Sequence, residues 1–374
     1  MMKRYLMTPG PTPVPEKIAL AMAAPIIHHR TKEYIDLHEK VREKLKKIFQ
    51  TQNDIVIFAS SGTGAMEASV SNILSENDKA LVVEAGKFGE RFSQLVSSFG
   101  AQAIILKKEY GDFANAQEIE DYVKKYSPKA VYMQACETST GVFHPIDEIG
   151  KMLKEKYPEV VFVVDGITAV GCIDIKTDEW GIDILLTGSQ KAFMLPPGLA
   201  MLSISEKAKK IAAQNKNKRY YFDILGELNA QAGHFTPAVT LVLGLNAAVD
   251  MMLEEGLGNV FKRHEFLAKA VKAAILAMDL ELFAKRPSNS LTAVKAPQSI
   301  DSKQIIDIMN KFGVSISNGQ GSMKGKIFRI AHLGYFYPPD VILTIGTLEI
   351  ALKKLGIDKL GVGTKKALEI FVEY

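Results

Sequence analysis

One lysine of this chain stands where a lysine can do chemistry. Lys191 follows the apolar run 182–186 and the small residues Thr187, Gly188 and Ser189, which places it just past the carboxyl end of an expected strand. Ligands of open α/β sheets bind at that edge. A lysine whose amine is held in an apolar pocket can lose its proton near neutral pH and form a Schiff base with an aldehyde. The chain has 46 basic residues, and most of them are expected to be solvated. Lys191 therefore becomes a candidate for chemistry only together with three further groups of residues.

The first group is a turn suited to a phosphate. Segment 60–64 has the sequence Ser-Ser-Gly-Thr-Gly, follows the apolar run 55–59 and opens a helical pattern. Such a turn offers backbone N–H groups, hydroxyls and the positive end of a helix dipole. It lacks the lysine of a P-loop and the third glycine of the dinucleotide motif. An ordinary capped helix start is the alternative interpretation.

The other two groups are charges inside apolar runs. Asp165 follows five apolar residues at 160–164, and Arg329 interrupts the apolar pattern of 327–331. A buried carboxylate is costly unless it meets a cation or a strong donor, so we expect its partner to be a ligand group or a neighbouring side chain. A helix cap or an interior ion pair is the alternative. The planar fork of arginine suits a carboxylate in a bidentate pair.

The elements that must position these residues alternate along most of the chain. Helices are expected at 32–49, 118–125 and 146–157. Such alternation with strands predicts a mostly parallel sheet covered by helices on both faces. The strands are expected at 55–59, 80–83, 103–106, 130–135, 160–164, 182–186 and 199–204.

The pattern changes near residue 255, where a long amphipathic stretch at 259–278 precedes a β, α, loop, β, α order. We therefore expect an extended N-terminal segment near the site at 1–19, a large domain at 20–255 and a smaller α+β domain at 256–374. The glycine-rich segment 318–325 precedes a strand and does not join a strand to a helix. We expect a loop near the substrate entrance there, and no nucleotide site.

The composition indicates the class of protein and the compartment in which we expect it. The chain of 374 residues is 47% hydrophobic and 24% charged, as in folded soluble proteins. Its net charge of +4 is scattered, which does not suggest nucleic-acid binding. Two cysteines, Cys136 and Cys172, allow no disulfide framework and no zinc site, and we expect no metal. Without a signal peptide or a span of about 20 apolar residues, we expect a cytoplasmic protein with no membrane partner.

A phosphate cradle, a buried carboxylate, a Schiff-base lysine and a carboxylate-binding arginine are together what pyridoxal 5′-phosphate (PLP) chemistry on amino acids requires. In this order they resemble the class V aminotransferases of the serine-pyruvate, alanine-glyoxylate and serine-glyoxylate group. The resemblance runs from segment 8–12 to Arg329, and its most specific motifs are Glu-Thr-Ser-Thr-Gly at 137–141, Val-Asp-Gly at 164–166 and Gly-Ser-Gln-Lys at 188–191. It implies the PLP-dependent fold type I, aspartate aminotransferase-like, whose large domain has a mostly parallel seven-stranded sheet beside a smaller α+β C-terminal domain.

The resemblance also implies site residues. Lys191 would hold PLP covalently and move the substrate's α-proton, and Asp165 would pair with the pyridine nitrogen. Arg329 would bind the substrate carboxylate, and Gly10 would lie beside the substrate side chain. The remaining implied contacts with PLP are the phosphate ligands Ser61, Gly62, Thr63 and Gln190, the stacking ring of Phe88, the hydroxyl of Thr138 and the apolar side chain of Ile167.

A homodimer with shared active sites is implied by one residue. Thr236 matches a position that reaches the phosphate of the neighbouring subunit's cofactor. Gly233 stands where the family commonly has a tyrosine, three residues earlier, and His234 is the candidate replacement. A lone histidine is, however, more often structural or exposed.

The implied activity moves an amino group from a small amino acid, alanine or serine, to a small 2-oxo acid, glyoxylate or pyruvate, in two stages. The small residues around Gly10 leave little room or charge for a long acidic side chain. If His28, His29 or Arg30 bound an acidic group, aspartate, phosphoserine or 2-aminoethylphosphonate would be favoured; an exposed dimer-contact loop is the alternative. A cysteine desulfurase is disfavoured because no cysteine follows Cys172. A PLP hydrolase or lyase of the same fold and a non-catalytic PLP-binding protein stay open as further interpretations.

Overall fold

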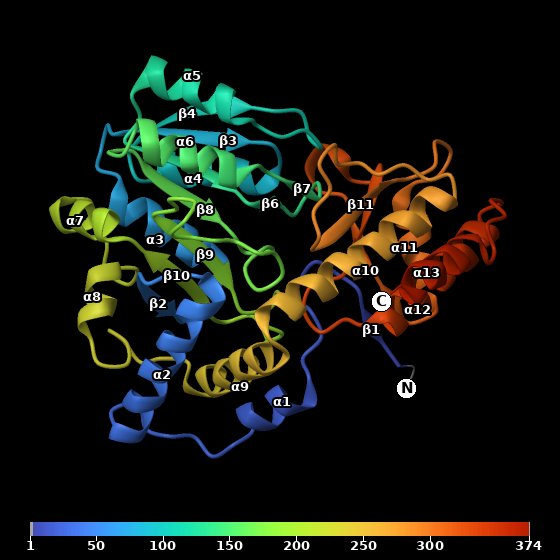
Figure 1. The fold of residues 1–374 in the computed structure, drawn as a ribbon, viewed down its shortest axis with the longest axis horizontal. Helices are drawn as coiled ribbons and strands as arrows, with labels where there is room; N and C mark the ends of the chain where they lie inside the picture. The colour runs from blue at the N-terminus through green and yellow to red at the C-terminus, as the bar shows by residue number, and fades with distance from the viewer. Residues whose placement is uncertain (1–2, 374) are drawn as a thin grey trace.

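A seven-stranded sheet forms the centre of the larger part of the computed structural model, which describes residues 3–373 (Figure 1). The strand order is β2-β10-β9-β8-β5-β3-β4; β10 pairs antiparallel with both of its neighbours, β2 and β9, and the other neighbouring pairs are parallel. The prediction of a mostly parallel sheet is confirmed, with strand ends displaced by one or two residues. The strands are β2 (Asp54–Phe58), β3 (Lys79–Glu84), β4 (Gln102–Lys107), β5 (Ala130–Gln134), β8 (Val161–Asp165), β9 (Ile184–Gly188) and β10 (Ala200–Ile204).

Helices cover both faces of this sheet because successive strand residues point to opposite sides. In β8, Val161 and Val163 belong to one apolar cluster, whereas Phe162 and Val164 belong to the other. The first cluster includes residues of α3 (Gly62–Ile73), α4 (Lys87–Ser98), α7 (Glu206–Gln214) and α8 (Ile224–Asn229). The second includes residues of α1 (Glu16–Met22), α2 (Lys32–Phe49), α5 (Ala116–Tyr126), α6 (Ile146–Lys156) and α9 (Val239–Glu255).

A second, three-stranded antiparallel sheet of order β11-β14-β13 has its own apolar cluster. The expected boundary at 255/256 falls at Gly256, between α9 of one cluster and α10 of the other. The elements of this part are α10 (Leu257–Ala277), β11 (Leu291–Lys295), α11 (Ser302–Lys311), β12 (Val314–Ser315), β13 (Ser317–Asn318), the 3₁₀ turn η1 (Gly321–Met323), β14 (Ile327–Ala331), α12 (Pro338–Lys354) and α13 (Val362–Val372).

The N-terminal segment links the two parts. Its strand β1 (Tyr5–Leu6) pairs in parallel with β12, and Met7 packs into the cluster of the smaller part. Thr12 then lies against the loop after β9, where its N–H donates to the carbonyl of Gln190 at 3.1 Å. The segment therefore runs from its two-stranded sheet with β12, in the smaller part, to the carboxyl edge of the seven-stranded sheet.

That edge is where the chemistry-bearing residues gather. Because β5, β8 and β9 run parallel, the segments that follow them start from the same side of the sheet. The segment after β5 carries the short hairpin of β6 (Cys136–Glu137) and β7 (Val142–Phe143). Among residues 3–373, none of the helices combines the length and the apolar character that crossing a bilayer requires.

Candidate active site

Lys191 lies three residues beyond β9 and is buried, with 9% of its surface exposed. Its ammonium group donates a hydrogen bond to the carbonyl of Pro9, and Thr12 donates from its hydroxyl to the carbonyl of Lys191 at 2.8 Å. Burial lowers the pKa of this lysine to about 8; Arg329 acts in the same direction, and Asp165 opposes it. A substantial fraction of the amine is therefore neutral near pH 7–8, as a nucleophilic lysine needs.

Gly10 is held against this lysine. Its φ of +122° is one that L side chains rarely adopt, and a Cβ built there would lie 2.4 Å from Nζ of Lys191. Only glycine lets the N-terminal segment pass so close to the amine.

Asp165 is the last residue of β8 and is 4% exposed. Its Oδ1 accepts a hydrogen bond from the backbone N–H of Ile167 at 2.9 Å, and among residues 3–373 its carboxylate has no other hydrogen bond and no ion pair. Burial raises the pKa of this carboxyl to about 7, although Lys191 opposes the rise. The carboxylate thus lacks the strong partner that would offset its desolvation.

The phosphate turn, residues 60–64, lies next to the loop that follows Asp165 and the loop that leads to Lys191. A Cβ on Gly62, the first residue of α3, would lie 2.5 Å from Cδ1 of Ile167. A Cβ on Gly188 would lie 3.6 Å from Cα of Gly62 and 2.9 Å from Oε1 of Gln190. That Oε1 is buried and has no hydrogen-bond partner within the described part of the chain. Ser61, at the N-cap of α3, is exposed, and its side chain makes no capping bond, which leaves its hydroxyl free for a ligand.

Two side chains that the sequence analysis did not select organise this region. Arg91, on α4, donates from Nη1 to Oγ1 of Thr63 at 3.0 Å, and its guanidinium lies 4.9 Å from the centre of the Phe88 ring. The spacing of three residues between Phe88 and Arg91 on one helix was the signal that could have pointed to this contact.

The second is Glu137, which is fully buried. Its Oε2 accepts from the N–H groups of Phe88 and Gly89, both at 3.1 Å, and its Oε1 accepts from the N–H of Ser139 at 3.0 Å. Burial raises the pKa of Glu137, and these hydrogen bonds oppose the rise. Glu137 thereby holds the first turn of α4, and with it the ring of Phe88.

Arg329 reaches the same edge from β14 of the smaller sheet and is 5% exposed. Its Nη1 donates to the carbonyl of Thr138 at 2.9 Å, and Nε and Nη2 donate to the carbonyl of Asn318 at 3.0 and 2.7 Å. No carboxylate of residues 3–373 forms an ion pair with it, and burial lowers its pKa to about 10. The hydroxyl of Thr138 lies 2.9 Å from that of Thr168.

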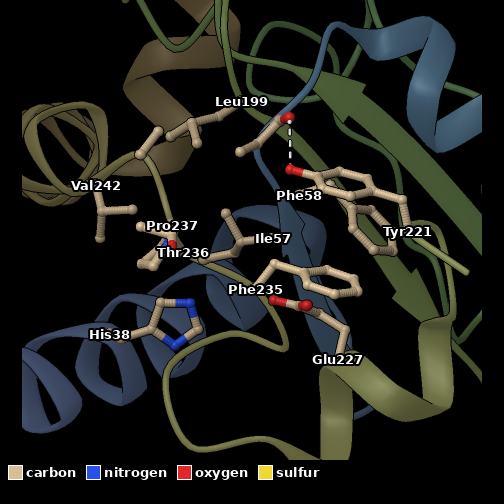
Figure 2. Close-up of a pocket in the computed structure, with 12 residues that line it drawn as sticks. His38, Ile57, Phe58, Leu199, Tyr221, Glu227, Phe235, Thr236, Pro237 and Val242 are labelled. Carbon is tan, nitrogen blue, oxygen red and sulfur yellow. Dashed lines mark hydrogen bonds between the residues drawn. The ribbon is translucent and has the colours of Figure 1, made fainter. Parts of the chain in front are cut away.

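Thr236 is not part of this group of residues. It is exposed and lines a separate cavity of about 20 Å³, together with His38, Tyr221, Glu227 and other residues between α2, β2 and the start of α9 (Figure 2). The loop before it has Gly233 at a φ of +111°, which a tyrosine would rarely adopt.

The remaining predicted loop residues also lie outside the group. His234 is exposed, and its backbone N–H donates to Glu227 at 2.8 Å. His28 and Arg30 are exposed and His29 is half-buried; in the described chain none of these three is hydrogen bonded to a residue near Lys191. No cluster of three or more His, Cys, Asp or Glu side chains among residues 3–373 is arranged to hold a metal ion.

A buried lysine at the carboxyl edge of a mostly parallel sheet, beside a buried aspartate and an arginine from a second sheet, defines an α/β enzyme of the transaminase type. Residues 4–335 match the class V aminotransferases, and the chain belongs to this family. The predictions of the family and of an enzyme of this kind are thereby confirmed.

Relatives extend over almost the whole chain. An uncharacterized aminotransferase of Methanocaldococcus jannaschii is 41% identical over 99% of this chain and 98% of its own length. An L-aspartate–glyoxylate aminotransferase of Paracoccus denitrificans is 35% identical, covering 96% of this chain and 94% of its own. A serine–glyoxylate aminotransferase of Hyphomicrobium methylovorum is 36% identical, covering 98% and 94%.

A solved structure is similar over its full length. Ureidoglycine–glyoxylate aminotransferase of Bacillus subtilis has a TM-score of 0.94 and 30% sequence identity, and the match covers 100% of this chain and 99% of that one. The predicted aminotransferase fold is therefore confirmed.

Proposed function

We propose that this class V aminotransferase uses PLP to move the amino group of alanine or serine to glyoxylate or pyruvate, as a cytoplasmic homodimer. The observation that carries the proposal is the buried amine of Lys191, which lies against Gly10 and within electrostatic reach of Asp165 and Arg329. These are the groups that a transaminase needs for a cofactor and for an amino-acid substrate.

Two buried charged groups of the site lack partners that PLP and its substrate would provide. The carboxylate of Asp165 has a single backbone donor, and the guanidinium of Arg329 donates only to carbonyl oxygens in the described part of the chain. A pyridinium nitrogen would serve the first and a substrate carboxylate the second. The residues therefore fit the cofactor.

Each residue then has a defined task. PLP, when bound, supplies an electron-withdrawing ring that stabilises negative charge on the substrate's α-carbon. Asp165 would pair with the ring nitrogen, and the amine of Lys191 would hold the cofactor. The same amine, with a pKa lowered to about 8 by burial, can accept and return the substrate's α-proton. Arg329 orients the substrate through its carboxylate.

The small volume beside Gly10 supports a small donor. A single added methyl at Gly10 would already touch Nζ of Lys191, so little room is left on that side of the amine for a long side chain. Aspartate is the second candidate donor, because the relative from Paracoccus denitrificans is named for it.

The homodimer is proposed because the chain leaves several residues exposed that a partner would contact. Leu20, on α1, and Ile26, just after it, are large apolar side chains that are 72% and 73% exposed, and a second subunit packed there would remove them from water. Thr236 is exposed and lies apart from the Lys191 group of its own chain, as a residue that serves a partner's site would be. Two buried free cysteines fit a reducing cytoplasm.

A panel of donors and acceptors tests the proposal. Each amino acid is mixed with the PLP-loaded enzyme, and the change of the cofactor spectrum gives the rate of the first half-reaction; 2-oxo acids give the second. We expect alanine or serine, followed by glyoxylate or pyruvate, to react fastest. If aspartate or phosphoserine reacts faster, the proposed donor is wrong, and if no amino acid changes the spectrum, the proposed activity is wrong.

A further inference from the structure

Arg91 is a cation to which the mechanism above gives no task. It is half-buried on α4, and no carboxylate of residues 3–373 forms an ion pair with it. The acid nearest in sequence, Glu90, is bonded to Lys87 and to the hydroxyl of Tyr110 instead. The hydrogen bond to Thr63 therefore leaves the charge of this guanidinium without an anionic partner in the described chain.

The phosphate turn needs positive charge. Its expected ligands Ser61, Gly62, Thr63 and Gln190 are all neutral. A phosphate monoester carries about −1.5 to −2 charges at pH 7, and the start of a helix such as α3 supplies the equivalent of about +0.5. About 1 to 1.5 negative charges are therefore left to be balanced. Arg91 is bonded to the turn through Thr63 and carries a positive charge.

The contact with Arg91 also determines where the hydroxyl proton of Thr63 can point. A threonine hydroxyl has one O–H to donate and two lone pairs to accept with. Because Nη1 of Arg91 donates to Oγ1 of Thr63 at 3.0 Å and an arginine cannot accept, the hydroxyl proton must point to another acceptor. A phosphate bound in the turn would be that acceptor.

The same guanidinium holds the ring of Phe88, whose centre lies 4.9 Å away. One side chain thus restrains both a phosphate ligand and the residue expected to stack on the cofactor ring. If Arg91 were lost, both contacts would loosen together.

We propose that Arg91 is a positioning residue of the cofactor site, which orients Thr63 as a hydrogen-bond donor and balances the charge of the cofactor's phosphate. The inference rests on the proposed use of PLP. It assigns the phosphate its cation, and it predicts that Arg91 discriminates between PLP and pyridoxal, which lacks the phosphate.

Binding of these two aldehydes to cofactor-free protein tests this. Wild type, R91Q, R91K and the control R42Q are titrated with PLP and with pyridoxal, and the absorbance change reports attachment. Arg42 is a suitable control because it is a partly buried arginine on α2 that bonds the carbonyl of Ile55, away from the site. We expect R91Q to raise the Kd for PLP about 10- to 100-fold and to change that for pyridoxal less than about twofold. R91K keeps the charge and should fall between, and R42Q should match wild type.

Phosphorus NMR of the PLP-loaded proteins gives an independent readout. A free phosphate monoester gains its proton near pH 6. In wild type the cation should keep the bound phosphate doubly ionised at pH 6, whereas in R91Q the midpoint should move up toward that value. An unchanged midpoint in R91Q overturns the proposal.

Equal losses of PLP and pyridoxal affinity in both R91Q and R91K also overturn it, since Arg91 would then only pack the helix. Failure of the proposed function looks different: wild type would give no absorbance change with PLP, or the change would persist in K191A.

Discussion

Replacing Gly10 with alanine tests how closely the N-terminal segment is fitted to Lys191. The added Cβ would lie 2.4 Å from Nζ, 2.6 Å from Cδ and 2.7 Å from Cε of that lysine, all well inside van der Waals contact. The φ of +122° adds backbone strain of about 1–3 kcal/mol, and overpacking a filled site costs about as much again. Because Lys191 is buried and bonded to Pro9, its amine must shift, and we expect the Kd for PLP to rise at least about 30-fold.

Two glycines provide matched controls for G10A. Gly356 has a φ of +92° and no atom within 4 Å of an added Cβ, so that G356A introduces strain without a clash. Gly258, in α10, has neither, and G258A should be neutral or slightly stabilising. PLP affinity by absorbance titration and stability by urea unfolding separate the two effects. We expect G356A to lose stability and keep wild-type PLP affinity; wild-type affinity in G10A would refute the described packing.

Three further experiments test the charged groups of Asp165, Arg329 and Lys191. Because burial raises the pKa of Asp165 from 3.8 to about 7, its ionisation costs the folded apoprotein stability as pH rises between these values. Urea unfolding should therefore show the D165N apoprotein about as stable as wild type at pH 4 and about 3–4 kcal/mol more stable at pH 8. Its PLP binding should be weaker. Equal stability of the two proteins at pH 8 would contradict this reasoning. R329Q should raise the KM of amino donor and 2-oxo acceptor about 10- to 150-fold through the lost charge-assisted bonds, and steady-state kinetics with an unchanged KM would exclude that role. Acetylation of Lys191 in the apoprotein, followed by peptide mass, should have its midpoint near pH 8, moving up in R329Q and down in D165N; a midpoint near 10 would show an ordinary surface lysine.

The main sheet could be predicted from the sequence because its strands are short, β-branched runs that end in small or polar residues. The run at 160–164 ends in Asp165, and the run at 182–186 leads to Lys191, so the same local pattern marked both the strands and their functional ends. Helix α2 (Lys32–Phe49) has the predicted limits, because Thr31 caps its start and Gln50 ends it in a left-handed conformation. These features depend on residues close together in the chain.

Contacts between distant segments could not be predicted in this way. Glu137 holds the start of a helix about 50 residues earlier in the chain, and the bond from Arg91 to Thr63 joins two neighbouring helices, so neither of these contacts has a local signature. The closeness of Gly10 and Lys191 depends on how the N-terminal segment crosses from the smaller part of the chain to the seven-stranded sheet. The role of Thr236 depends on a second subunit and stays a prediction.

The most direct test of the central claim is to locate the cofactor on the chain. The PLP-loaded protein is treated with borohydride, which makes the lysine linkage permanent, and is then digested and mapped by mass spectrometry. We predict a single pyridoxyl group, on the peptide that contains Lys191 and its neighbours Gln190 and Ala192. A label on any other lysine, or no label at all, would contradict the assignment of Lys191 as the residue that binds PLP.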